Sequence, residues 1–255
     1  MEPIRIGAVS YLNTKPFVYG LTHAPHRPDM IISADYPSSI ATQLEAKEID
    51  IGLIPIAAIE SIPTARIITD FCIGSEGAVA SVAIFSEVPL EKVTHLLLDY
   101  QSKTSVALAR LLLQKYWNLS PQLEKAIGAD FLNKIHGSTA AVVIGDRALD
   151  LYNKYPYRYD LAEAWRDMTG LPFVFATWVA NRDLPEEFIT RFNQALAWGV
   201  EHWQQLLPEL PPMSYDPTVY FSTNISYPLT PEKKKGMMLF LDYLQAEKQV
   251  SGHFV

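Results

Sequence analysis

Two polar loops of this chain carry the side chains best suited to bind a small anion. The first, Ser10–Pro16 (SYLNTKP), follows the apolar stretch Ile4–Val9, which predicts a strand, and Pro16 predicts the first turn of a helix. Ligands of open α/β sheets bind where loops leave the carboxyl ends of strands. A strand–helix connection also needs polar caps, so the sequence alone supports both interpretations. The candidate ligand-binding residues of this loop are Ser10, Tyr11, Asn13 and Thr14.

The second loop, Asp99–Ser105 (DYQSKTS), ends the predicted strand His95–Asp99 and opens a helix. Ser102 suits the N-cap position, because its hydroxyl can accept from backbone N–H groups of the first turn. Thr104 and Ser105 add hydroxyls at the positive end of the helix dipole. A carboxylate is stabilised there by about 0.3–1 kcal/mol, and by up to about 2 kcal/mol when partly buried. Ordinary capping explains the same residues.

Two further places could contribute to such a site. Gly145-Asp146-Arg147 follows the predicted strand Ala140–Ile144, and Asp146 either caps its own helix or orients Ser102 or Thr104. Ser81 lies in the middle of the stretch Ala78–Phe85 (AVASVAIF), which predicts a strand. A strand serine facing a neighbour or water is the simplest interpretation of Ser81.

Other kinds of chemistry find little support. The six histidines include no HxH or HxxxH pair, and neither a CxxC nor an EF-hand pattern occurs, so no metal site is predicted. No GxGxxG or Walker loop occurs, and no cofactor is expected. No serine sits in a nucleophile elbow. Cys72, the single cysteine, lies in an apolar run and is predicted to be a buried core residue.

The composition predicts a globular protein without nucleic-acid or membrane partners. Of 255 residues, 49% are hydrophobic and 19% charged, and the net charge is −7 without a Lys/Arg stripe. No apolar run reaches the length of about 18 residues that spans a membrane. The start, Met-Glu-Pro-Ile-Arg, has no signal-peptide pattern, so a cytoplasmic location is expected. The oligomeric state is not indicated.

Strand and helix patterns alternate along the chain in two series. The first includes strands at Ile31–Ala34 and Ile49–Ile54, with a helix opening at Pro37, and predicts a mostly parallel sheet. The second includes the helix Lys103–Trp117 and the strand Ala140–Ile144. Long extended segments, including Leu171–Ala180, join the two series. After Pro185 the pattern is helical to the end, and the last helix begins at Thr230–Pro231.

Two α/β series joined by two extended segments predict a two-lobed α/β protein with a ligand cleft between the lobes. We expect residues 1–86 plus 180–255 to form lobe one, and residues 87–179 to form lobe two.

Six blocks of the chain resemble the chorismate dehydratase family of the futalosine route to menaquinone. Their order and spacing are specific, although each alone would be weak, and the match becomes looser after residue 185. The resemblance implies a periplasmic-binding-protein-like (type II), two-lobed fold. The blocks are RIGAVSYLNTKP (5–16), IDIGLIP (49–55), IGSEGAVASVAIFS (73–86), LDYQSKTSVAL (98–108), IGDRAL (144–149) and TGLPFVFATW (169–178).

The resemblance implies a lyase that removes water from chorismate to give 3-[(1-carboxyvinyl)oxy]benzoate. Loss of the ring C3 proton and the C4 hydroxyl makes the ring aromatic, so no cofactor is needed. No histidine or buried carboxylate in these blocks is an evident base. We therefore hypothesise that the enolpyruvyl carboxylate of chorismate takes the C3 proton.

The resemblance also assigns roles to residues. Asn13 and Ser81 are the catalytic candidates. The substrate-binding candidates are Ser10, Tyr11 and Thr14 in the first loop, Ser102, Thr104 and Ser105 at the helix N-terminus, and Thr177 and Trp178 along the cleft.

Two alternatives stay open at this point. The first is a small-anion binding protein of the same fold. The second is the later enzyme of the same pathway, which forms dihydroxynaphthoate. Turnover of chorismate, as against stoichiometric binding, separates the first alternative from the dehydratase.

Overall fold

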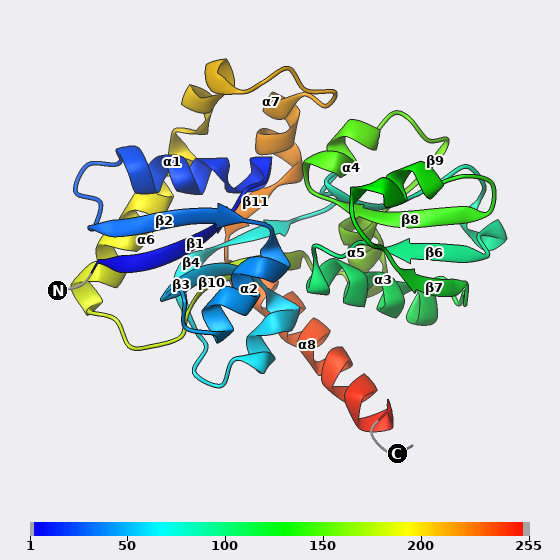
Figure 1. Cartoon of the computed structure of the whole chain (residues 1–255), viewed down its shortest axis with the longest axis horizontal. Helices are drawn as coiled ribbons and strands as arrows, with labels where there is room; N and C mark the ends of the chain where they lie inside the picture. The colour runs from blue at the N-terminus through cyan, green and yellow to red at the C-terminus, as the bar shows by residue number, and fades with distance from the viewer. Residues whose placement is uncertain (1–2, 252–255) are drawn as a thin grey trace.

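Two mixed β-sheets organise the chain, each in a lobe of its own (Figure 1). The computed structural model describes residues 3–251. The first sheet has the order β11-β4-β10-β3-β1-β2, and the second has the order β7-β6-β8-β5-β9. The expected two-lobed α/β architecture is therefore confirmed. The first sheet comprises β1 (Ile4–Val9), β2 (Met30–Asp35), β3 (Ile51–Pro55), β4 (Arg66–Ser75), β10 (Phe173–Ala180) and β11 (Ser226–Pro228). The second comprises β5 (Val82–Ser86), β6 (His95–Leu98), β7 (Gln122–Lys125), β8 (Thr139–Ile144) and β9 (Tyr157–Asp160).

Each sheet has a parallel part and an antiparallel part. β1 runs parallel to β2 and β3, as the strand–helix alternation predicts, and β6 runs parallel to β7 and β8. In contrast, β10 runs antiparallel to β3 and β4, and β5 runs antiparallel to β8 and β9. Every residue of β3, β5 and β10 is buried. Strands that are covered on both faces show no alternation of apolar and polar residues. The sequence therefore does not indicate which side chains point to which face of the sheet.

Helices cover the sheets and connect the lobes (Figure 1). α1 packs on α6, where Gly20 and Gly199 allow close approach, since a Cβ on either would lie 2.0 Å from a backbone oxygen. Near the junction of the lobes, Trp165 of α5 packs edge-on against Phe173 and Phe240. The helices are α1 (Lys15–His23), α2 (Pro37–Glu45), α3 (Lys103–Lys115), α4 (Asp146–Leu151), α5 (Leu161–Thr169), α6 (Glu186–Glu201), α7 (Pro217–Val219) and α8 (Pro231–Ser251). Short 3₁₀ helices lie at Leu12–Thr14, Ile56–Ser61, Leu90–Lys92, Ala129–Lys134 and Trp203–Glu209.

The sheets divide the chain at other positions than we expected. β5 pairs with β8 and β9 and so belongs to the second sheet, although the boundary at residue 86 assigns it to lobe one. β10 pairs with β3 and β4 in the first sheet, although the range 87–179 assigns it to lobe two. Pairing with distant strands decides to which sheet a strand belongs, and two fully buried strands carry no local mark of their partners. We therefore propose that the chain crosses between lobes at residues 76–81 and 161–172.

The segment after α6 is less helical than expected. It contains a 3₁₀ helix, a π-helix (Tyr220–Asn224) and β11, which pairs with β4 at the edge of the first sheet. The last helix does begin at Pro231, with the Thr230 hydroxyl accepting from Lys233 N at 3.2 Å. Cys72 is fully buried, as predicted.

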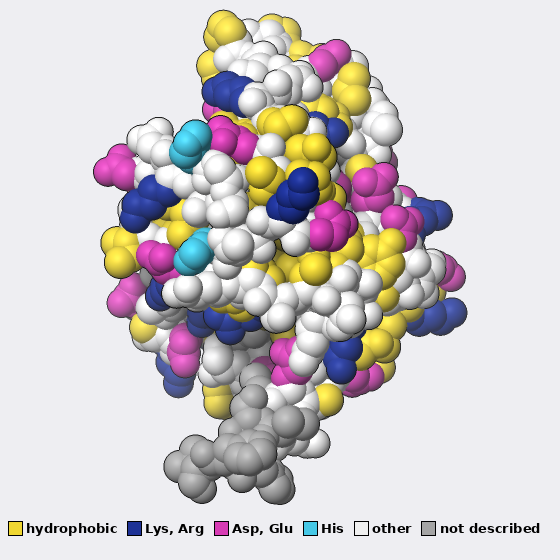
Figure 2. Space-filling model, turned by 90° about the vertical axis from the view of Figure 1, so that its right-hand side faces the viewer, with side chains coloured by type: hydrophobic (Ala, Val, Ile, Leu, Met, Phe, Trp, Pro, Cys, Tyr) yellow, Lys and Arg dark blue, Asp and Glu magenta, His cyan; other side chains and the backbone are white. Residues whose placement is uncertain are grey.

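The surface shown in Figure 2 intersperses acidic and basic side chains without a continuous basic stripe. Among residues 3–251, no helix combines the length and apolar character that crossing a membrane requires.

Candidate functional site

A small cavity, partly open to solvent, lies between the two lobes. Both predicted loops reach it: Tyr11 and Asn13 come from the first, and Ser102 and Ser105 from the second. Ser81 and Gly145 complete its polar part. The remaining walls are apolar and consist of Val9, Pro37, Pro55, Ile73, Val79, Val82, Ile144, Phe175 and Ala176.

Two hydrogen bonds fix Asn13 in place. Its backbone carbonyl accepts a hydrogen bond from the Tyr227 hydroxyl at 2.9 Å, which ties it to β11. Its Oδ1 accepts from the Thr14 hydroxyl at 3.1 Å. Thr14 is fully buried and does not line the cavity, so it orients the Asn13 amide instead of touching a ligand.

Ser81 lies in a tight turn before β5, and not in the middle of a strand as we expected. Ser81 N donates to Val79 O at 2.7 Å, and Ala80 has a φ of +61°. A positive φ at a residue other than glycine costs on the order of 1–3 kcal/mol and persists only when the surroundings hold it. Strand propensity could not reveal this turn, because the groups that hold it come from distant segments.

Three distant groups hold this turn. Asp160 Oδ2 accepts from Ala80 N at 2.7 Å, while its Oδ1 caps α5. Asn224 Nδ2 donates to Ala78 O at 3.1 Å, and Gly145 N donates to Ser81 O at 2.8 Å. Burial raises the pKa of Asp160 to about 6, although the backbone N–H groups act to lower it.

Tyr220 is a site residue that the sequence analysis missed. Its hydroxyl lies 2.8 Å from Ser81 Oγ, and its side chain is fully buried. Burial raises the pKa of Tyr220, while hydrogen bonds with the side chains of Ser81 and Asn13 lower it. Tyr220 lies in the π-helix, beyond the blocks that carry the family resemblance, and nothing local in its sequence marks it as functional.

The N-terminus of α3 presents Ser102 and Ser105 to the cavity. Ser102 Oγ caps the helix by accepting from Ser105 N at 3.1 Å, as predicted, and donates to Ser105 Oγ at 3.0 Å. Thr104 takes a different role, since its Oγ1 accepts from Ala57 N in the first lobe at 3.1 Å. Thr104 thus joins the lobes and does not line the cavity.

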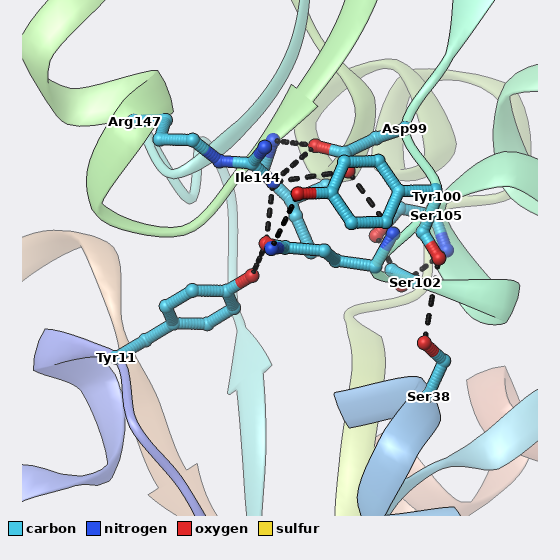
Figure 3. A network of polar contacts seen from close by, with 9 residues as sticks. Tyr11, Ser38, Asp99, Tyr100, Ser102, Ser105, Ile144 and Arg147 are labelled. Carbon is cyan, nitrogen blue, oxygen red and sulfur yellow. Dashed lines mark hydrogen bonds and ion pairs between the residues drawn. The ribbon is translucent and has the colours of Figure 1, made fainter. Parts of the chain in front are cut away.

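A buried polar network beside the cavity links the lobes (Figure 3). Gln101 Oε1 accepts from the Tyr11 hydroxyl and, at 2.6 Å, from Arg147 Nη2. Arg147 also pairs with the buried Asp99, at 2.8 and 3.0 Å to its two oxygens. Burial raises the pKa of Asp99 while Arg147 opposes that rise, and burial likewise raises the pKa of Tyr11.

Asp146 also connects the two lobes. It has neither of the two roles considered for it, which were capping its own helix and orienting Ser102 or Thr104. Its Oδ1 accepts from Leu12 N of the first lobe at 2.8 Å, so it neither caps α4 with its side chain nor contacts Ser102 or Thr104.

Besides Thr14 and Thr104, three more predicted site residues lie away from the cavity. Thr177 is fully buried, and its hydroxyl donates to Phe71 O at 3.1 Å. Trp178 packs edge-on against Phe17 and Phe192 in the core of the first lobe. Ser10 is exposed at the end of β1, where its N–H donates to Asp35 O at 3.0 Å. On β10, Phe175 and Ala176 line the cavity, whereas Thr177 and Trp178 do not.

The cavity offers hydrogen-bond donors without a base. Among the described residues that line it, the polar side chains carry hydroxyls and one amide, with no carboxylate, imidazole or amine. Such a set can bind an anion and stabilise developing negative charge. It cannot itself take up a proton from a substrate near neutral pH.

Solved structures share this architecture. The protein AF1704 of Archaeoglobus fulgidus aligns with a TM-score of 0.74 at 13% identity, over 97% of this chain and 98% of that one. The periplasmic aliphatic sulphonate binding protein SsuA of Escherichia coli aligns with a TM-score of 0.62 at 16% identity, over 98% and 94%. At these identities the likeness shows the periplasmic-binding-protein-like fold alone.

Sequence relatives narrow the comparison to one family. A chorismate dehydratase of Thermus thermophilus is 27% identical over 72% of each chain. A chorismate dehydratase of Campylobacter jejuni is 30% identical over 73% of this chain and 72% of its own. The model of the menaquinone biosynthesis family matches residues 4–246, which includes the segment after residue 185. This chain therefore belongs to the menaquinone biosynthesis family.

Proposed function

We propose that this protein is a lyase that dehydrates chorismate to 3-[(1-carboxyvinyl)oxy]benzoate in the futalosine route to menaquinone. Its family and the name shared by the two chorismate dehydratases compared above support this substrate. The observation that carries the mechanism is the cavity itself, which presents Asn13 and Ser81 among donors and has no base among its described lining residues.

The reaction follows from this set of donors. Ser102 and Ser105, at the positive end of α3, bind a carboxylate of the substrate. The enolpyruvyl carboxylate of chorismate takes the ring C3 proton, because the wall offers no other acceptor of suitable pKa. The electron pair of that C–H bond enters the ring, and the C4–O bond breaks as the hydroxyl leaves. Ser81 donates a hydrogen bond to the departing oxygen, and Asn13 orients the ring. The proton and the hydroxide together form the water that is released.

A second candidate function is the binding and release of a small anion without turnover. The fold likeness to SsuA favours it, because that protein is described as an aliphatic sulphonate binding protein. The donor set of the cavity fits either function.

Incubation of the purified protein with chorismate, after removal of metal ions by a chelator, tests the proposal. We expect a product lighter by one water with a new aromatic absorbance, measured by chromatography and mass spectrometry. Asn13→Ala and Ser81→Ala should abolish most of the turnover, whereas Ser120→Ala, at an exposed serine, should not. Tight binding without product would indicate the receptor, and neither binding nor product would overturn both proposals.

A cytoplasmic location belongs to this proposal. Fractionation of cells that produce the protein would test it.

A further inference from the structure

Tyr220 contacts Ser81, one of the two catalytic candidates, from behind the cavity. Its hydroxyl lies 2.8 Å from Ser81 Oγ. Tyr220 does not itself line the cavity, so it acts on a ligand only through Ser81. The direction of this hydrogen bond therefore decides whether Ser81 faces the substrate as a donor or as an acceptor.

The direction of the hydrogen bond between Tyr220 and Ser81 follows from the acidity of the two hydroxyls. A phenol, with a pKa of about 10, is a much stronger hydrogen-bond donor than the aliphatic hydroxyl of serine. Tyr220 therefore donates its proton to Ser81 Oγ, which lies 2.8 Å away. The proton of Ser81 is left to point into the cavity.

We propose that Tyr220 is a positioning residue that makes Ser81 a hydrogen-bond donor toward the leaving hydroxyl of the substrate. This inference rests on the proposed dehydration of chorismate. The reverse direction would have Ser81 donate to Tyr220 and face the substrate as an acceptor, which would oppose departure of hydroxide.

The surroundings of Tyr220 keep it in place and protonated. Within the same π-helix, Asn224 donates to Ala78 O at 3.1 Å and accepts from the Tyr215 hydroxyl at 2.8 Å, which anchors the helix to the turn that carries Ser81. Full burial raises the pKa of Tyr220, so its hydroxyl keeps the proton that it donates. The segment after residue 185 therefore contributes to the site through its contacts.

Steady-state kinetics on chorismate with Tyr220→Phe test the proposal. We expect kcat to fall about tenfold with KM changed less than about threefold, because the variant leaves the cavity walls intact and removes only the partner of Ser81. The double variant Ser81→Ala/Tyr220→Phe should be no slower than Ser81→Ala, since both act through one hydroxyl. Tyr19→Phe, which removes an exposed hydroxyl bonded to Gln205, should leave kcat unchanged.

The outcomes separate this inference from the proposed function. A wild-type protein that does not convert chorismate would overturn the function. A wild-type protein that turns over while Tyr220→Phe keeps full kcat, or whose double variant loses the product of both single effects, would overturn the inference alone. If Tyr220→Phe does not fold, 3-fluorotyrosine placed at position 220 replaces it, because this residue keeps the ring and the hydroxyl and makes the phenol a stronger donor. A changed kcat with an unchanged KM supports the proposal, and an unchanged kcat contradicts it.

Discussion

Ser102 and Ser105, at the N-terminus of α3, have different roles: the first caps the helix and the second is available to a ligand. Ser102 uses its hydroxyl as acceptor for Ser105 N and as donor to Ser105 Oγ. The proton of Ser105 is therefore free to point into the cavity, and the cap itself stays intact without it. Removing the Ser102 hydroxyl and removing the Ser105 hydroxyl should therefore have different consequences.

We expect Ser105→Ala to raise the KM for chorismate about tenfold with little change in kcat, because it removes a hydrogen bond to a charged group. Ser102→Ala should raise KM as well, and it should also lower the melting temperature by about 2–4 °C, because a lost N-cap costs about 1 kcal/mol. Kinetics and thermal unfolding check both expectations. Equal melting temperatures of the two variants would contradict the division of roles.

At the scale of elements, the turn 78–81 owes its shape to an acid on another strand. Asp160, at the end of β9, accepts from the backbone N–H of Ala80 with one oxygen and caps α5 with the other. The carboxylate therefore holds a strained turn and a helix end at the same time. Protonation removes part of its accepting capacity while Ala80 still requires an acceptor at a positive φ.

We expect turnover of chorismate to fall as the pH drops through about 6, the raised pKa of Asp160. Stability should respond in the opposite direction. A folded-state pKa above the unfolded value of 3.8 means that the folded state binds the proton more strongly. The contribution of Asp160 to stability therefore decreases as the pH rises from about 4 to about 6. Asp160→Asn should be slow at every pH and lack this acid limb, measured as kcat/KM against pH. A wild-type limb that persists unchanged in the variant would assign the titration to another group.

The sequence predicts those elements whose conformation depends on neighbouring residues in the chain. It does not predict those held by residues from distant segments. β1, α1 and the N-cap of α3 follow from apolar runs, Pro16 and Ser102, all of which act within a few residues. Ala80 shows the opposite situation, because its conformation is held by Asp160 and Asn224 from other segments. The position of Trp178, away from the cavity, could not be predicted for a related reason. A strand buried on both faces does not reveal which of its side chains reach the cavity.

At the scale of the whole molecule, short contacts across the cavity hold the lobes together. Leu12 N donates to Asp146, Ser38 N donates to Gln101 O at 3.2 Å, and the Tyr11 hydroxyl donates to the Gln101 side chain. Near these contacts, the ring of Tyr11 from the first lobe packs against the backbone of Gly145 from the second. A Cβ on Gly145 would lie 2.9 Å from atoms of the Tyr11 ring. Only glycine therefore permits this closeness of the lobes.

We expect Gly145→Ala to push the lobes apart, raising the KM for chorismate and increasing the radius of gyration measured by small-angle X-ray scattering. Gly145 also has a φ of +66°, so backbone strain must be separated from the steric clash. Gly128 provides the match, because it has a φ of +65° and a Cβ added there would meet nothing within 4 Å. Gly128→Ala should carry a comparable strain but leave both KM and the scattering profile unchanged. If the two variants change the profile equally, strain in lobe two, and not contact with Tyr11, limits the approach of the lobes. If Gly145→Ala alone opens the molecule, the contact between Tyr11 and the Gly145 backbone sets how closely the donors of the two lobes approach a shared substrate.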